Sequence, residues 1–376
     1  MIPYGRQDID AADIAAVVEV LQSDWLTTGP AVERFEQAAA SRFGAAHAVA
    51  VCNGTVALHL ACRALGLGPG DALWTSPNTF VASANCALYC GASVDFVDID
   101  PQTYNMSASA LEKKLLTTKK IPRIVVPVHF AGQPCDMRAI GALAKKYGFA
   151  VIEDASHAVG ASTLGEPAGN CRHSDITVFS FHPVKIVTTA EGGMTLTRRA
   201  DLAEKLRTLR AHGIVRDPAR MGAKNEGGWY YEQVDLGYNY RITDLQAALG
   251  ESQLRRLDAL LARRRELAAR YDRLLADLPL TRPWQHPDGL SAWHLYVVQV
   301  EHRRQVYDAL RAAGIGVNVH YIPVHLQPYY RKLGFKRGDF PHAEAYYARA
   351  LTLPLFPRMS DLDQDHVVEA VRKAVA

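Results

Sequence analysis

The stretch that decides the fold reads Phe149-Ala150-Val151-Ile152-Glu153-Asp154. A short apolar run of this kind is typical of a strand that is buried on both faces of a parallel sheet. We expect Asp154 to lie at the carboxyl end of that strand, where open α/β sheets bind ligands. Because a buried carboxylate is costly without a partner, we favour a functional role for Asp154 over a purely structural one.

On either side of this stretch, short apolar runs alternate with helical patterns. This rhythm is typical of a mostly parallel sheet with helices on both faces, so the predicted fold class is α/β. The predicted strands are Ala46–Val51, Ala72–Thr75, Val94–Ile99, Ile124–Val128, Ala150–Glu153, Ile176–Phe181 and Met194–Thr197. The predicted helices between them are Thr55–Leu65, Phe80–Tyr89, Ser107–Leu116 and Met137–Tyr147.

The chain of 376 residues is too long for one ordinary core, so we expect two domains. Residues 1–250 would form an N-terminal segment and the large domain, and residues 251–376 a smaller C-terminal α+β domain. A helical pattern from Thr243 to about Leu278 is long enough, if unbroken, to pass from one domain to the next. Beyond it we predict a strand Trp293–Val300, a helix Arg303–Ala313, a strand Gly316–Tyr321 and a last helix that opens at Ser360.

The composition narrows the classes of function. Hydrophobic residues make up 48% of the chain, and its net charge is only +3 without any long block of like charges, so a nucleic-acid binder is not expected. The six cysteines show no Cys-x-x-Cys pair and no metal-ligand spacing, so we expect reduced thiols, no metal and a cytoplasmic location. No apolar run has the length of a membrane span, and the N-terminus carries no signal core.

A lysine follows the next predicted strand, Ile176–Phe181. It ends the run Ser180-Phe181-His182-Pro183-Val184-Lys185, which leads into a turn with the sequence Glu191-Gly192-Gly193. A lysine on such a turn, with an aspartate at the tip of a neighbouring strand, is the minimum chemistry of a pyridoxal phosphate (PLP) enzyme. The lysine forms a Schiff base with the cofactor aldehyde, and the aspartate keeps the pyridine nitrogen protonated. A solvated surface lysine is the alternative reading for Lys185 taken alone.

Three other parts of such a site can be sought in the sequence. Gly54 and Thr55 stand where a strand passes into a helix, and the helix N-terminus can bind the cofactor phosphate, with Ser180 as a further donor. Phe80 begins a predicted helix, where an aromatic ring can cover one face of the cofactor. His157 can contact the ring hydroxyl. A plain helix cap, a core phenylalanine and a structural histidine remain open alternatives for these positions.

Taken together, these residues resemble the DegT/DnrJ/StrS family of aminotransferases, which act on nucleotide-linked keto-sugars. The matching segments appear in family order and span well over half of the chain. They are Trp25-Leu26-Thr27-Thr28-Gly29-Pro30, Asn53-Gly54-Thr55, Glu153-Asp154-Ala155-Ser156-His157, the run from Ser180 to Lys185, and Leu236-Gly237-Tyr238-Asn239-Tyr240-Arg241.

The resemblance implies a fold-type-I PLP enzyme that works as a homodimer with shared active sites. Lys185 is similar to the Schiff-base lysine, and Asp154 to the partner of the pyridine nitrogen. The family's cofactor contacts map onto Gly54, Thr55, Phe80, His157, Ser180 and Asn239, the last reaching the neighbouring subunit's cofactor. The sugar-nucleotide contacts would come from Tyr4, Trp25, Leu26, Thr27, Arg241, His320 and Tyr321.

Within the family, the chain resembles most the branch that works in pseudaminic acid synthesis. This implies transfer of an amino group from L-glutamate to the 4-keto position of a UDP-linked 4-keto-6-deoxy-N-acetyl hexosamine, with 2-oxoglutarate as the other product. A sister enzyme that acts on a dTDP-linked or 3-keto sugar is one alternative, and a PLP-binding regulatory protein without turnover is another. The related dehydratases carry histidine at the lysine position, so Lys185 argues against dehydration.

Overall fold

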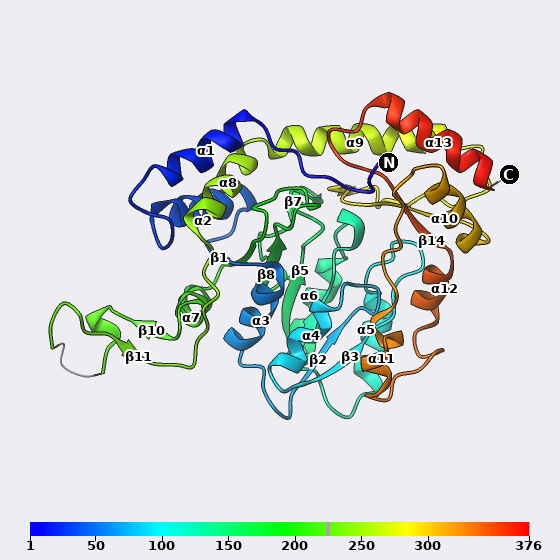
Figure 1. Ribbon diagram of the computed structural model, residues 1–376. Coiled ribbons are helices and arrows are strands. Elements are labelled where there is room, and N and C mark those ends of the chain that lie inside the picture. Colours follow the sequence, from blue (N-terminus) through cyan, green and yellow to red (C-terminus); the bar gives the residue numbers. More distant parts are fainter. Residues whose placement is uncertain (223–225, 376) are drawn as a thin grey trace.

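The computed structural model describes residues 1–222 and 226–375, and within them a central seven-stranded sheet has the order β1-β9-β8-β5-β4-β2-β3 (Figure 1). Strand β9 runs antiparallel to its neighbours β1 and β8, whereas the pairs from β8 to β3 are parallel. The mostly parallel α/β fold is therefore confirmed. The strands are β1 (His47–Val51), β2 (Ala72–Thr75), β3 (Ser93–Phe96), β4 (Ile124–Val126), β5 (Ala150–Asp154), β8 (Ile176–Ser180) and β9 (Gly193–Thr197).

Helices cover both faces of this sheet. Successive side chains of a strand point to opposite faces, so Ile152 of β5 packs in the apolar cluster under α3 and α4, whereas Val151 packs in the cluster under α5 and α6. A third cluster joins α2 and α8 to β1, β8 and β9. The helices of this part are α1 (Ala11–Leu21), α2 (Pro30–Phe43), α3 (Gly54–Ala64), α4 (Ala82–Tyr89), α5 (Ala108–Thr117), α6 (Met137–Tyr147) and α7 (Ala200–Arg210).

The predicted boundaries in this half are close to the observed ones. Each of the seven strands lies within its predicted segment or extends one residue beyond it, and α3 and α5 are each displaced by one residue. The predictions for β2 and α6 are correct to the residue. The strand boundaries are predicted accurately because the strands are buried on both faces and bounded by turns.

The second half differs from prediction at two points. The long helical pattern is two helices, since it breaks at Arg256, whose side chain is tied to Asp8, Asp10 and Asp13 of the N-terminal region. The strand predicted over Gly316–Tyr321 is wrong, because the backbone there makes only the isolated bridge between Asn318 and Thr352. The elements are α8 (Asp244–Arg255), α9 (Leu257–Leu274), β13 (Tyr296–Gln299), α10 (Arg303–Ala312), α11 (Pro328–Arg331), α12 (Pro341–Arg349), β14 (Ala350–Leu353) and α13 (Asp361–Val375).

A separate apolar cluster forms around β13, β14, α9, α10 and α13. Figure 1 shows α9 running along one side of the molecule toward α13. The N-terminal segment reaches this part of the chain, since Ile2 forms a bridge with Ile315 and packs against the cluster. The boundary between residues 250 and 251 stays a prediction. As predicted, Ser360 and Asp363 exchange hydrogen bonds at the start of α13.

Short strands complete the described chain. The hairpin of β10 (Ile214–Val215) and β11 (Glu232–Gln233) forms an arm that projects from the body (Figure 1). A small sheet of β12 (Gly289–Leu290), β6 (Ser162–Thr163) and β7 (Glu166–Pro167) lies apart from the central one. Short 3₁₀ turns are η1 (Phe130–Gly132), η2 (Pro218–Arg220) and η3 (Val324–Leu326). Among the described residues, no helix combines the length and the apolar character that crossing a membrane requires.

Candidate active site

The site lies at the carboxyl edge of the central sheet. Strands β1, β5 and β8 run in the same direction, so the residues that follow or end them meet at one edge. Asn53 and Gly54 follow β1, Asp154 ends β5 and Ser180 ends β8. Lys185 lies in the loop between β8 and β9. The topology thus brings together residues that lie more than a hundred positions apart in the sequence.

Asp154 is buried, with 5% of its surface exposed, and is held by two donors. The hydroxyl of Ser83 donates to its Oδ2 at 2.6 Å, and the backbone N–H of Ser156 donates to its Oδ1 at 3.1 Å. Ser83 in turn lies 2.8 Å from the hydroxyl of Thr79. Among the described residues, no arginine or lysine is in hydrogen-bonding contact with the carboxylate, which leaves its charge available to a bound group.

Lys185 lies in a tight loop whose backbone is well anchored. Its N–H donates to the carbonyl of His182 at 2.9 Å, and the N–H of Thr189 donates to the carbonyl of Phe181 at 3.0 Å. The residue is partly buried, and desolvation lowers the pKa of its amine to about 8, although Asp154 acts in the opposite direction. About a tenth of the amine is therefore neutral, and nucleophilic, at pH 7, far more than for an ordinary lysine with a pKa of about 10.4.

The start of α3 forms a cradle without side chains. A Cβ on Gly54 would lie 2.9 Å from the Cβ of Ser180, and a Cβ on Gly193 would lie 2.4 Å from the carbonyl oxygen of Asn53. Only glycine fits at these two contacts. The side chain of Asn53 caps the helix by accepting from the N–H of Val56 at 3.0 Å. The Ser180 side chain thus lies close to the N-terminus of α3, whose first N–H groups can bind an anion.

His157 is buried, and its tautomer follows from its contacts. The N–H of Ala131 donates to Nδ1 at 3.3 Å, so the ring carries its proton on Nε2, which donates to the Tyr321 hydroxyl at 3.1 Å. Burial, and then the charge of Lys185, lower the pKa of His157 well below its usual value, which agrees with a neutral ring. The Tyr321 hydroxyl keeps its own proton free for a ligand.

An aromatic wall continues from Tyr321. The exposed ring of Phe80 lies 6.3 Å from it, and the ring of Tyr4 packs 5.3 Å from that of His320. His320 is buried and its Nδ1 lies 2.8 Å from the Thr352 hydroxyl, while burial and Lys185 lower its pKa to about 3. The N-terminal segment and the loop around residue 320 are therefore parts of the same site.

The remaining predicted residues lie at the start of α3 or on other segments of the chain. The loop of Trp25, Leu26 and Thr27 is exposed and pairs with the start of α8 through Thr243 and Asp244. Arg241 is partly buried, and across residues 1–222 and 226–375 its guanidinium has no hydrogen bond or ion pair. Asn239 is exposed on the strand-like segment beside Ala211. Thr55 lies at the start of α3 and is half-buried.

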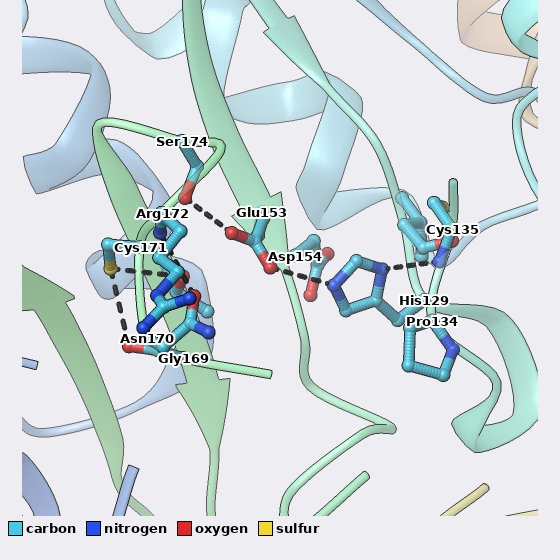
Figure 2. A network of polar contacts seen from close by, with 12 residues as sticks. His129, Pro134, Cys135, Glu153, Asp154, Gly169, Asn170, Cys171, Arg172 and Ser174 are labelled. Carbon is cyan, nitrogen blue, oxygen red and sulfur yellow. Dashed lines mark hydrogen bonds and ion pairs between the residues drawn. The ribbon is translucent and has the colours of Figure 1, made fainter. Parts of the chain in front are cut away.

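The opposite face of β5 carries a second polar group. Figure 2 shows Glu153 between His129 and Ser174, with Asp154 beside it on the strand. Nε2 of His129 donates to Glu153 at 2.9 Å, because Nδ1 of the same ring accepts from the N–H of Cys135 at 3.1 Å, and Ser174 donates to the other oxygen. Burial raises the pKa of Glu153, but these donors outweigh it and the net shift is downward.

The comparisons with known proteins agree with this geometry. The model of the DegT/DnrJ/EryC1/StrS aminotransferase family matches residues 7–372. The chain belongs to this family. It is 45% identical over 383 aligned residues to the spore coat polysaccharide biosynthesis protein SpsC of Bacillus subtilis, with 100% of this chain and 97% of that protein covered.

Solved structures of the family share the whole fold. The putative sugar aminotransferase Spr1654 of Streptococcus pneumoniae, in its PMP form, superposes with a TM-score of 0.92 at 32% identity, covering 100% of this chain and 99% of that one. PseC of Helicobacter pylori, an aminotransferase in the biosynthesis of pseudaminic acid, gives 0.92 at 30% identity with the same coverage. The family and these neighbours are PLP-dependent sugar aminotransferases of fold type I, so the chain is an enzyme of that class.

The residues of the DegT-family site fit PLP. Gly54, Gly193 and Ser180 form the anion cradle, the buried carboxylate of Asp154 suits a protonated ring nitrogen, and Lys185 presents an amine with a lowered pKa. When bound, PLP supplies an aromatic ring that accepts electrons from the bond being broken. The fit rests on a phosphate end, a carboxylate end and an amine that the fold brings to one edge of the sheet.

One residue of the site was not predicted from the sequence. His294 is buried, and its ring lies 4.3 Å from that of His157. In the sequence it is a single histidine within the apolar run before β13, and such residues are usually structural. The loop of η1 brings it to the site, and this packing leaves no signal in the local pattern.

Proposed function

We propose that the enzyme transfers an amino group from L-glutamate to the 4-keto group of a UDP-linked 4-keto-6-deoxy-N-acetyl hexosamine. The observation that carries the transfer chemistry is the pairing of Lys185, whose amine has a pKa of about 8, with the buried Asp154. The sugar class is supported by the likeness to SpsC and PseC, whose names refer to polysaccharide and pseudaminic acid biosynthesis.

In this proposal Lys185 moves the proton in both half-reactions. With a pKa of about 8 its amine exists in both protonation states near neutral pH, so it can take a proton from the amino donor and return one to the aminated product. Asp154 supplies the negative charge that keeps the cofactor ring nitrogen protonated. Gly54, Thr55 and Ser180 would hold the phosphate, and Phe80 would cover the ring.

The sugar nucleotide would enter beside Tyr4, His320 and Tyr321. The Tyr321 hydroxyl, whose oxygen accepts from His157, can donate its proton to the sugar. The exposed residues Trp25, Leu26 and Thr27 and the partly buried Arg241 would complete this side. Because they lie apart from Lys185 within one chain, we propose that they act in a dimer.

A homodimer with shared sites is supported by the arm of β10 and β11. Its apolar side chains are open to solvent, with Trp229 73% and Leu236 71% exposed, and Asn239 follows directly. A second copy of the chain would bury this surface. Asn239→Ala is then expected to weaken PLP retention in the dimer, whereas an unchanged PLP affinity would contradict its role in the site. We also propose a cytoplasmic location, which the six free thiols favour.

A sister activity on a dTDP-linked or 3-keto sugar is the second candidate, because the name of the relative at 45% identity specifies neither the nucleotide nor the keto position. The test has two steps. L-glutamate alone should convert the cofactor spectrum of the holoenzyme to the aminated form and release 2-oxoglutarate. UDP- and dTDP-linked keto-sugars are then offered, and the amino sugars are identified by mass spectrometry. Preference for the UDP-linked 4-keto sugar supports the proposal, and preference for another substrate contradicts it.

A further inference from the structure

His294 is a buried imidazole without a hydrogen-bond partner. It is 5% exposed, and neither ring nitrogen bonds to another group in the part of the chain that the structure describes. Buried polar groups are nearly always hydrogen-bonded, since an unpaired one costs roughly 1–3 kcal/mol. A histidine in this state beside the candidate active site points to a partner that binds there.

Hydrogen bonds to the η1 turn hold the backbone around His294 in place. The N–H groups of Ala292 and Leu295 donate to the carbonyls of Gly132 and Ala131 at 3.0 and 3.2 Å. A Cβ on Gly132 would lie 2.7 Å from the nitrogen of Trp293, so glycine is required for this approach. Ala131 and Trp293 both have positive φ, at 57° and 49°. Strained residues of this kind persist at functional sites, where the surroundings determine the conformation.

Arg264 fixes the same segment from the other side. It is 1% exposed, and its Nη1 donates to the carbonyls of Trp293, His294 and Leu355 at 3.2, 3.4 and 3.0 Å. It has no carboxylate partner among residues 1–222 and 226–375, and burial lowers its pKa to about 10. Arg264 is thus an uncompensated buried cation that ties the His294 segment to α9.

The charges around His294 favour an anion. The groups that act on it are His157, Lys185, Arg264 and His320, and none of them is acidic. Burial, followed by these neighbours, lowers the pKa of His294 well below its usual value, so the ring stays neutral and offers one N–H donor. A neutral donor with two cations, Lys185 and Arg264, among its neighbours suits a carboxylate oxygen.

We propose that His294 contacts the amino donor by donating a hydrogen bond to one of its carboxylates, and that Arg264 acts as the positioning residue. This inference rests on the proposed function, because it names residues that select a dicarboxylate donor. The two roles are distinct: His294 touches the substrate, and Arg264 acts through the backbone of Trp293 and His294.

Calorimetric titration of the PLP-loaded enzyme with glutarate tests the contact. Glutarate has the two carboxylates of the donor and no amino or keto group. His294→Phe should weaken glutarate binding about 10- to 100-fold, the worth of one hydrogen bond to a charged group. His294→Asn, which keeps a donor, should lose less, and Arg264→Lys should give a smaller loss in the same direction. UDP affinity, PLP absorbance and Tm serve as checks, and His342→Phe on the exposed surface is the matched control.

Two results with the variants overturn the inference. One is unchanged glutarate binding in His294→Phe, or in His294→Ala if the phenylalanine variant does not fold. The other is an equal loss of glutarate and UDP affinity, which would mean a general structural role. Wild-type enzyme that converts glutamate yet fails to bind glutarate also contradicts it. Failure of the wild-type enzyme to convert glutamate at all would instead contradict the proposed function.

Discussion

Glu153 and Asp154 are adjacent on β5 and almost equally buried, at 4% and 5% exposed, yet their surroundings differ. Each oxygen of the Glu153 carboxylate accepts a hydrogen bond from within the fold, one from a histidine and one from a serine (Figure 2). Within the part of the chain that the structure describes, Asp154 accepts from one serine hydroxyl and one backbone N–H, and its charge acts on Lys185. The alternation of a strand thus turns two similar acids to opposite faces, one that serves stability and one that faces the site.

Because Asp154 faces the site and Glu153 does not, removal of the charge of Asp154 should mainly affect the rate, and removal of the charge of Glu153 should mainly affect stability. Asp154→Asn should lower the rate of the glutamate half-reaction by about 10²-fold or more, because the charge that favours a protonated ring nitrogen is lost. The unfolding midpoint of the cofactor-free protein should change little. Stopped-flow absorbance and thermal unfolding measure the two effects.

Glu153→Gln is the reciprocal variant. Removal of one charge from a closed, buried network should lower the free energy of unfolding by about 3 kcal/mol. The half-reaction rate of the folded fraction should stay within about threefold of the wild-type rate. A rate loss as large as that of Asp154→Asn would show that the two faces are not separate in function.

The serines that donate to these two carboxylates should show the same difference between rate and stability, with smaller effects. Ser83→Ala removes the 2.6 Å donor from Asp154, and we expect a fall of roughly tenfold in the half-reaction rate, the worth of about one hydrogen bond. Ser174→Ala removes a donor from Glu153 and should lower stability instead, with little effect on rate. If both variants gave the same pattern, the assignment of the two faces would be wrong.

The sequence predicts the residues at the carboxyl edge of the central sheet better than the residues that surround them. The strands that carry Asp154 and lead to Lys185 are predicted from doubly apolar runs and turn residues, and these are local signals. The strand predicted at Gly316–Tyr321 fails because an extended, apolar pattern also suits a loop that lines a site. His294 was missed because its role depends on contact with η1, some 160 residues earlier, and on Gly132.

The pKa of Lys185 should also respond differently to substitutions on the two faces of β5. In the cofactor-free protein, acylation of Lys185 should rise through pH 8, against about 10.4 for an ordinary lysine. Asp154→Asn should lower this pKa further, since Asp154 favours the charged amine, and Glu153→Gln should leave it unchanged.

The lowered pKa of Lys185 also makes the free energy of unfolding depend on pH. Between about pH 8 and 10.4 the unfolded chain holds a proton that the folded chain has lost, so this lysine makes stability rise with pH in that window. Lys185→Met should remove the rise. An amine that titrates near pH 10.4 in the folded protein would contradict its burial beside the site.

The central claim is that Lys185 carries the cofactor on the Asp154 face of the sheet. The most direct measurement is borohydride reduction of the PLP-loaded enzyme, followed by digestion and mass spectrometry of the peptides. The account predicts a single pyridoxyl-modified lysine, Lys185, and no modification in Lys185→Ala. Modification at another lysine in the wild-type enzyme, or a Lys185→Ala variant that carries the cofactor and turns over like the parent, would contradict it.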